Sequence, residues 1–232
     1  MKLKESGRLE DLCRRHLEYF VELAEKAAPE LQGPRQGEVL DALQRDLPNI
    51  RKALDYAVTA GEASGCLRLT VALRRFWAMR GHAGEARKWI GHGLRLSTGQ
   101  ATQLRVNALH LAGLLAEIQG DLSESRRYFS ESAALARGIG DRAGLAQGVA
   151  SLGEVWLGSG EYAEARARLE EGKALRRELG DEIGEKRLVM SLSDAALGLG
   201  DYDAAADYAE QGLAATRQEG NRHNESQALF LP

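Results

Sequence analysis

The chain contains few of the residues on which small secreted proteins and membrane proteins depend. Only two cysteines, Cys13 and Cys66, occur among 232 residues, and neither belongs to a CxxC pair. A disulfide framework and a structural zinc site are therefore not supported. No apolar run approaches the length of a membrane span, and residues 1–16 lack the apolar segment of a signal peptide. We therefore expect a cytoplasmic protein with reduced cysteines and no membrane partner.

The net charge and the aromatic content of the chain are also low. The 31 basic side chains oppose 34 acidic ones, which leaves a net charge of -3. Such a chain has no general basic field for a phosphate backbone, so we do not expect direct binding of nucleic acid. Aromatic residues make up 6% of the chain although 44% of it is hydrophobic, and there are 26 glycines. Abundant small residues allow helices to approach one another closely.

No sequence motif indicates catalysis, a cofactor or a metal. The chain has no G-x-x-x-x-G-K-[ST] sequence, so it lacks the loop that holds nucleotide phosphates. The histidines have no HExxH spacing, and we interpret His82 and His92 as turn and surface residues rather than metal ligands. The glycines of residues 138–144 follow no strand, which favours a role at helix ends. We therefore do not expect this chain to be an enzyme.

A repeat of forty residues organises most of the chain. Pairs of glycine and an acidic residue or asparagine mark the beginning and the middle of each period. The first set is Gly120-Asp121, Gly160-Glu161 and Gly200-Asp201, and the second is Gly140-Asp141, Gly180-Asp181 and Gly220-Asn221. About eighteen residues rich in Ala, Leu, Arg and Glu follow each pair, which predicts two helices and two turns in each period. We expect an all-α, right-handed solenoid of helical hairpins with about twelve helices.

The expected helices fall into three segments. Residues 1–61 form an N-terminal helical segment, divided by two prolines and a glycine after residue 28 and by Pro48 at a helix start. Its helices are expected at 7–28, 35–46 and 48–60. Residues 62–220 hold four hairpins, expected at 63–80 with 83–97, 101–119 with 122–138, 142–158 with 162–179, and 182–198 with 202–219. Residues 221–232 begin an incomplete fifth hairpin, which indicates that the sequence is a piece of a longer chain or that the natural chain continues.

Positions inside the period indicate the type of repeat. The period around Gly160 contains, in order, Leu152, Gly153, Trp156, Tyr162, Ala165, Leu169 and Gly172. This order resembles the tetratricopeptide pattern, in which Gly153 and Ala165 are expected where the two helices cross, with Trp156 and Tyr162 beside them. The ordinary repeat has about 34 residues, so a forty-residue period implies longer helices. HEAT and armadillo repeats have a similar period but do not predict this order of glycine, aromatic residue and alanine.

A second resemblance concerns the segment Asp46–Leu94. It resembles the start of the sensor region in bacterial signal-transduction ATPases of the NB-ARC or STAND class, multidomain regulators that often carry a DNA-binding domain. The matching residues are Asn49, Ile50, Arg51, Ala53 and Leu54, then Phe76, Trp77, Arg80, Gly81, His82 and Trp89. The segment Arg14–Ala27 also resembles the helix that follows the winged-helix part of those proteins. Since the nucleotide-binding motif is missing here, the resemblance implies a sensor region without its ATPase.

The tetratricopeptide resemblance implies that the first helix of each hairpin lines a concave groove. One position in each repeat carries a hydrogen-bonding side chain, namely Arg68, Asn107, Gln147, Arg187 and Gln227. Further polar candidates follow on the same helices, namely Arg75, His110, Glu154 and Asp194. Such a ladder of donors and acceptors can bind the backbone or the carboxylates of an extended segment. The mixed signs disfavour a purely acidic ligand, and the alternative is a face that is polar only for solubility.

Two functions therefore stay open at the level of sequence. The first is a non-catalytic sensor and protein-interaction module of a bacterial regulator of transcription. It would bind a protein, a peptide or a small effector in its groove and relay occupancy to an ATPase on the natural chain. The second is a free-standing scaffold that joins partner proteins without a switch. The sequence indicates neither the ligand nor the oligomeric state, and it leaves the convex face open as an interface.

Overall fold

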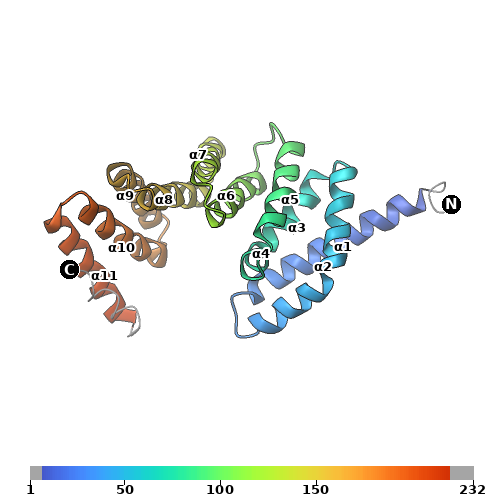
Figure 1. Cartoon of the computed structure of the whole chain (residues 1–232), viewed down its shortest axis with the longest axis horizontal. Coiled ribbons are helices and arrows are strands. Elements are labelled where there is room, and N and C mark those ends of the chain that lie inside the picture. The colour runs from blue at the N-terminus through green and yellow to red at the C-terminus, as the bar shows by residue number, and fades with distance from the viewer. Residues whose placement is uncertain (1–6, 220–232) are drawn as a thin grey trace. The chain divides into compact units, whose positions relative to one another are not determined.

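The computed structural model describes residues 7–219, and the start of the fifth hairpin, including Gln227, lies outside them. Over the described residues the chain forms eleven helices and no strand, which confirms the all-α class (Figure 1). The chain divides into two compact units, Met1–Asp121 and Leu122–Pro232. The boundary falls between the two helices of the second expected hairpin. Each unit is described by itself below.

The first unit contains an N-terminal pair of helices, the first hairpin and the first helix of the second hairpin. Its helices are α1 (Arg8–Glu30), α2 (Gln36–Thr59), α3 (Ala63–Ala72), α4 (Arg74–Met79), α5 (Ala83–Leu96) and α6 (Gln103–Ile118). Helix α1 packs against α2 and α3, while α3 packs against α5 and α6. Both helices of the N-terminal pair contact α3, just as both α3 and α5 of the first hairpin contact α6. The N-terminal pair therefore stacks on the first hairpin as one repeat of a solenoid stacks on the next.

Pro48 does not begin a helix and Pro29 does not block one at the places that the sequence predicted. Pro48 lies inside the single helix α2, and Pro29 lies inside the last turn of α1. A proline inside a helix costs about 3 kcal/mol or more. Helix α2 buries aliphatic side chains on both sides of Pro48, namely Leu40, Leu43, Leu47, Ile50 and Leu54. Each such side chain contributes roughly 1.5–3 kcal/mol, so packing outweighs the proline. The expected separation of 35–46 from 48–60 was therefore wrong.

The expected helix at 63–80 is also different, because it is interrupted at Leu73. The indole N–H of Trp77 in α4 donates to the carbonyl oxygen of Thr70, the last but two residue of α3, at 3.0 Å. Leu73, Phe76 and Trp77 are all fully buried. The interruption thus lets two adjacent aromatic side chains enter the core and gives the buried indole a hydrogen-bond acceptor.

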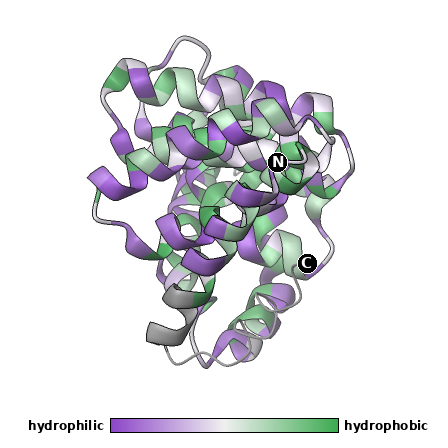
Figure 2. Cartoon of the chain, turned by 90° about the vertical axis from the view of Figure 1, so that its left-hand side faces the viewer, coloured by the Kyte–Doolittle hydropathy of each residue, from purple (hydrophilic) through white to green (hydrophobic). Residues whose placement is uncertain are grey.

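The second unit contains five helices, each close to its expected bounds. They are α7 (Leu122–Ile139), α8 (Arg142–Gly158), α9 (Tyr162–Glu178), α10 (Glu182–Gly198) and α11 (Tyr202–Glu219). Each helix packs against the next one in the chain, and α8 also contacts α10. Hydrophobic and hydrophilic residues alternate along the helices in Figure 2, as expected for amphipathic helices that share a core.

The glycines in the turns that follow α2 adopt positive φ angles. Gly160 has a φ of 77° and Gly180 a φ of 68°, and no residue other than glycine has a positive φ in the described chain. The acidic residue after the first set of glycines accepts a charged hydrogen bond from the second helix of the preceding hairpin. The three pairs are Arg87 with Asp121 at 2.6 Å, Arg126 with Glu161 at 2.9 Å and Arg166 with Asp201 at 2.9 Å. The beginning of each period therefore carries a link between neighbouring repeats.

The acids of the second set cap the helices that follow them, as Asp201 of the first set also does by accepting from the Ala204 N–H at 3.2 Å. Asp141 and Asp181 precede α8 and α10, and each carboxylate accepts from the backbone N–H of a glycine three residues later, at 2.9 Å. These are N-caps, which satisfy a donor that the helix itself leaves without a partner. The Gly184 N–H and the Arg176 guanidinium hold the pKa of Asp181 below its ordinary value.

The expected crossing of helices at Gly153 and Ala165 is present. Ala165 is fully buried, and a β-carbon built on Gly153 would lie 2.8 Å from Leu169 Cγ and 3.1 Å from the Leu169 backbone nitrogen. Trp156 packs against this cluster but is only partly buried, and the Arg126 guanidinium lies 4.3 Å above its ring. Gly153 therefore allows α8 and α9 to approach more closely than any other residue would permit.

We predict that Gly153→Ala destabilises the protein by about 1–3 kcal/mol, because the new methyl group meets both the side chain and the backbone of Leu169. Gly138 in α7 is the matched control, since no atom beyond its own stretch of helix backbone lies within 4 Å of the position that a β-carbon would take. Gly138→Ala should stabilise by up to about 1 kcal/mol through helix propensity. Urea unfolding measures both changes, and equal effects would contradict the close approach.

A second prediction compares two tryptophans. Trp77→Ala should cost about 3–5 kcal/mol, because the indole is fully buried and hydrogen-bonded. Trp156→Ala should cost about 1–2 kcal/mol, because a partly exposed ring gains less from burial. Thermal and urea unfolding of the two variants test this order, and the reverse order would show that Trp156 is the better-packed ring.

Candidate functional site

In the second unit, the four candidate residues occupy two neighbouring helices. Gln147 and Glu154 lie on α8, Arg187 and Asp194 lie on α10, and all four are exposed. Residues seven apart share one face of a helix. The Ser191 hydroxyl, which lies between Arg187 and Asp194 on the same stripe, donates to Glu154 Oε1 at 2.7 Å. The two stripes therefore lie side by side and form what we call the first-helix face of this unit.

Asp194 is the member of this face with the most unusual environment. Partial burial raises the pKa of its carboxyl above the ordinary value. Its side chain has no hydrogen bond or ion pair with any of residues 7–219. An ionised carboxylate that is partly removed from water and lacks a counter-ion is a good acceptor for a cationic or N–H group of a ligand.

In the first unit, the structure separates the candidates into exposed and buried side chains. Arg68 on α3 and Asn107 on α6 are exposed. The Arg68 guanidinium already donates to both oxygens of Glu25 on α1, at 2.8 and 2.7 Å. His110 on α6 is only 8% exposed, so a partner has little access to its ring. The exposed side chains of α3, α4 and α6 form the first-helix face of this unit.

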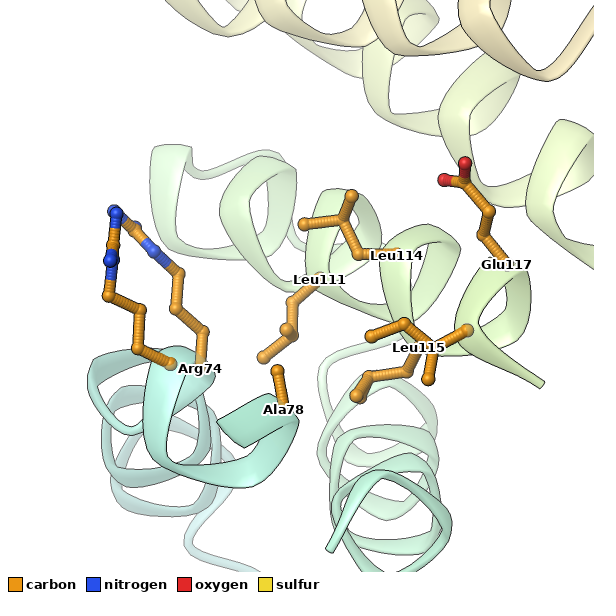
Figure 3. Close-up of a pocket in the computed structure, with 8 residues that line it drawn as sticks. Arg74, Ala78, Leu111, Leu114, Leu115 and Glu117 are labelled. Atoms are coloured by element: carbon orange, nitrogen blue, oxygen red, sulfur yellow. The ribbon is translucent and has the colours of Figure 1, made fainter. Parts of the chain in front are cut away.

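Arg75 lines a pocket of about 570 Å³ between α4 and α6. Apolar side chains form its wall, namely Ala78, Leu111, Leu114, Leu115 and Ile118. Figure 3 shows Leu111 facing Ala78, with Arg74 at one end of the pocket and Glu117 at the other. Pockets of this size with an apolar wall and a few charged groups at the rim are typical of ligand sites.

The sequence predicted Arg75 but did not predict Arg74, the apolar pocket or the ion pair of Arg68. The pocket depends on residues of α4 and α6 that are at least 33 positions apart in the chain, and the ion pair joins residues 43 apart. Two adjacent arginines before the buried Phe76 and Trp77 are the only local signal for this end of the pocket.

The residues that carry the second resemblance have structural contacts of their own. Arg80, in the turn after α4, forms an ion pair with Asp41 of α2, and the side chains of His82 and Gln44 share a hydrogen bond of 3.2 Å. Arg51 of α2 donates to both oxygens of Glu85 in α5, at 2.8 and 2.7 Å. These residues therefore attach α2 to the first hairpin.

Two further properties concern the described residues only. No helix within residues 7–219 has the length and apolar character of a membrane span. The same residues contain no group of three His, Cys, Asp or Glu side chains arranged to hold a metal ion.

Comparison with known proteins gives structural relatives but no sequence family. No protein-family model and no curated protein matches the chain. Among solved structures, a Podosopora anserina protein described as a kinesin light chain with nearly identical tetratricopeptide-like repeats has a TM-score of 0.68 and 14% identity. The alignment covers 86% of this chain and 96% of that one.

Two other solved structures are similar. One is a signal-transduction ATPase with numerous domains and a tetratricopeptide repeat sensor, from Pyrococcus horikoshii, with a TM-score of 0.63 and 12% identity over 99% of this chain and 40% of that one. The other is a Rap protein complexed with competence and sporulation factor, with a TM-score of 0.58 and 16% identity over 90% and 62% of the two chains. At these identities the likeness shows the fold, which is a tetratricopeptide-like solenoid of helical hairpins.

The raised pKa of Asp194 generates a prediction about stability. The pKa of Asp194 is higher in the folded state than in the unfolded state, so the ionised carboxylate destabilises the fold at neutral pH. Below both pKa values the carboxyl is protonated in the two states, and this effect disappears. Asp194→Asn should therefore stabilise the protein at pH 7, and the gain should vanish near pH 3. Thermal unfolding at both pH values measures this difference. An asparagine variant that is less stable than the parent at pH 7 would reveal a cationic partner for the carboxylate.

Proposed function

We propose that this chain is a non-catalytic protein-interaction and sensor module, which binds a protein or peptide on its first-helix faces. The observation that carries the proposal is the exposure of polar side chains on successive first helices. Of the eight candidate residues within the described part of the chain, seven are exposed, namely Arg68, Arg75, Asn107, Gln147, Glu154, Arg187 and Asp194. A face that was polar for solubility alone would not need an apolar pocket of about 570 Å³ beside one of these side chains.

The structure offers this ligand two kinds of contact. Unpaired polar groups such as Asp194 can bond to the backbone of an extended segment, while the pocket between α4 and α6 can take an apolar side chain. A small effector is the second class of ligand that this pocket suits by size. The similarity to a Rap protein in complex with competence and sporulation factor supports the use of such a fold for binding.

We further propose that occupancy is relayed to an ATPase on the natural chain. The similarity to the Pyrococcus horikoshii ATPase with a tetratricopeptide repeat sensor supports this idea, because the alignment covers 99% of this chain and 40% of that larger protein. Residues 1–61 would then lead into the array of residues 62–220, since Arg80 and Arg51 attach α2 to the first hairpin. The alternative is a free-standing scaffold. Immunoblotting of the native product separates them: a band much larger than 25.3 kDa supports the relay, and a band near this mass contradicts it.

Charge changes on the first-helix faces test the binding proposal. Random twelve-residue peptides on phage are first selected on the parent protein, and retention of the selected pool is then measured on variants. Arg187→Glu should lower retention about tenfold, because an exposed arginine contact becomes repulsive to a carboxylate. Helicity and melting temperature should stay unchanged.

A single charge reversal at Arg68 would also break its ion pair with Glu25, so this position is tested with a double variant. The double change Glu25→Arg and Arg68→Glu restores the ion pair in the opposite order, so it alters the charge of α3 while keeping the link to α1. Lys88→Glu on α5 is the control, since Lys88 is exposed on a second helix. If all of these variants retain the pool as the parent does, the interface lies on another surface and the proposal fails.

A further inference from the structure

Arg74 and Arg75 differ from the arginines around them. Arg68, Arg80 and Arg87 each form an ion pair with a carboxylate of another part of the first unit. Arg74 and Arg75 are both exposed, and neither guanidinium group has a hydrogen bond or an ion pair within residues 7–219. They follow the interruption at Leu73, so two adjacent guanidinium groups at the start of α4 have their donors available.

The same two arginines line two apolar pockets. The larger one, of about 570 Å³, lies between α4 and α6 (Figure 3). The smaller one, of about 300 Å³, lies between α3 and the end of α1, where Ala28, Pro29 and Leu31 form part of its wall. Because Arg74 and Arg75 belong to both walls, the pair separates one apolar pocket from the other.

We propose that this site binds an extended peptide in which one acidic residue is flanked, two positions away on each side, by apolar residues. In an extended chain, side chains point alternately to opposite faces, so residues i−2, i and i+2 all face the same surface. The acidic side chain then lies over Arg74 and Arg75, and the two apolar side chains enter the two pockets. This inference rests on the proposed function and specifies its ligand.

Charge favours a single acidic residue in this ligand. Two adjacent guanidinium groups offer several donors to the two oxygens of one carboxylate. Glu117 lies at the far end of the larger pocket, where its carboxylate disfavours a second acidic group of the ligand. The two apolar side chains would be about 13 Å apart along the peptide, the length of four extended residues.

Synthetic peptides test the spacing. The probe is a fluorescein-labelled nine-residue peptide with the core Leu-Ser-Glu-Ser-Leu, titrated with the parent protein by fluorescence anisotropy. One control peptide replaces the glutamate by lysine. The other has the core Leu-Glu-Ser-Ser-Leu, which turns the carboxylate to the opposite face. The first peptide should bind about tenfold or more tightly than either control. Equal affinities of the three peptides would overturn the proposal.

Protein variants test the site. The double change Arg74→Glu and Arg75→Glu should weaken binding of the first peptide about tenfold or more. Ala78→Trp fills the larger pocket and Gln32→Trp fills the smaller one, so each should also weaken it. Arg45→Glu is the matched control, because Arg45 is exposed on α2 and lines neither pocket. Unchanged binding in the double variant, with unchanged helicity, contradicts the site.

The selected phage pool separates failure of this inference from failure of the proposed function. Enrichment of the apolar-x-acidic-x-apolar pattern, with loss of retention on the double arginine variant, supports both. A pool that lacks the pattern and ignores the arginines, yet depends on Arg187, overturns the inference and leaves the proposed function standing. If no peptide is enriched above the unselected library, both fail.

Discussion

From α6 to α11, each turn between helices depends on a glycine that adopts a positive φ and is followed by an acidic residue. The glycine lets one helix end and the next begin within a few residues, without the strain that a side chain would cause. The acid that follows stabilises the turn in two ways. Asp181 caps the helix that it precedes, and Asp201 caps its helix as well while also accepting from Arg166 of the preceding hairpin. One class of turn thus closes each hairpin and also joins it to its neighbour.

This arrangement makes stability a local property. In a solenoid each repeat contacts only its neighbours, so the core and the turn contacts supply the folding free energy step by step. Few side chains of the first-helix faces take part. Arg68 is held by Glu25 and Glu154 by Ser191, but Arg74 and Arg75 contribute no ion pair to the fold within residues 7–219. Exposed charge that the fold does not use is available for a ligand at little cost to stability.

The sequence predicted the regular parts of the fold well because local signals determine them. The glycine and acid pairs gave α8 and α10 their correct bounds, 142–158 and 182–198. The failures at Pro48 and Leu73 have a common cause, since tertiary burial decides whether a proline is tolerated and whether a helix is interrupted. The site follows the same division. Exposure of Gln147 follows from periodicity, but the burial of His110 and the pairing of Arg68 depend on residues distant in the chain.

The position of α4 explains how binding could be relayed. This helix has only six residues, with Arg74 and Arg75 at its start, and the turn after it holds α2 through Arg80 and His82. A ligand over the two arginines therefore contacts an element whose other end is attached to the N-terminal pair. A relay requires that the ligand bind one arrangement of this element better than another. Because Phe76 and Trp77 anchor α4 in the core, a second arrangement of this short helix would have to move these two buried side chains together with Arg80 and His82.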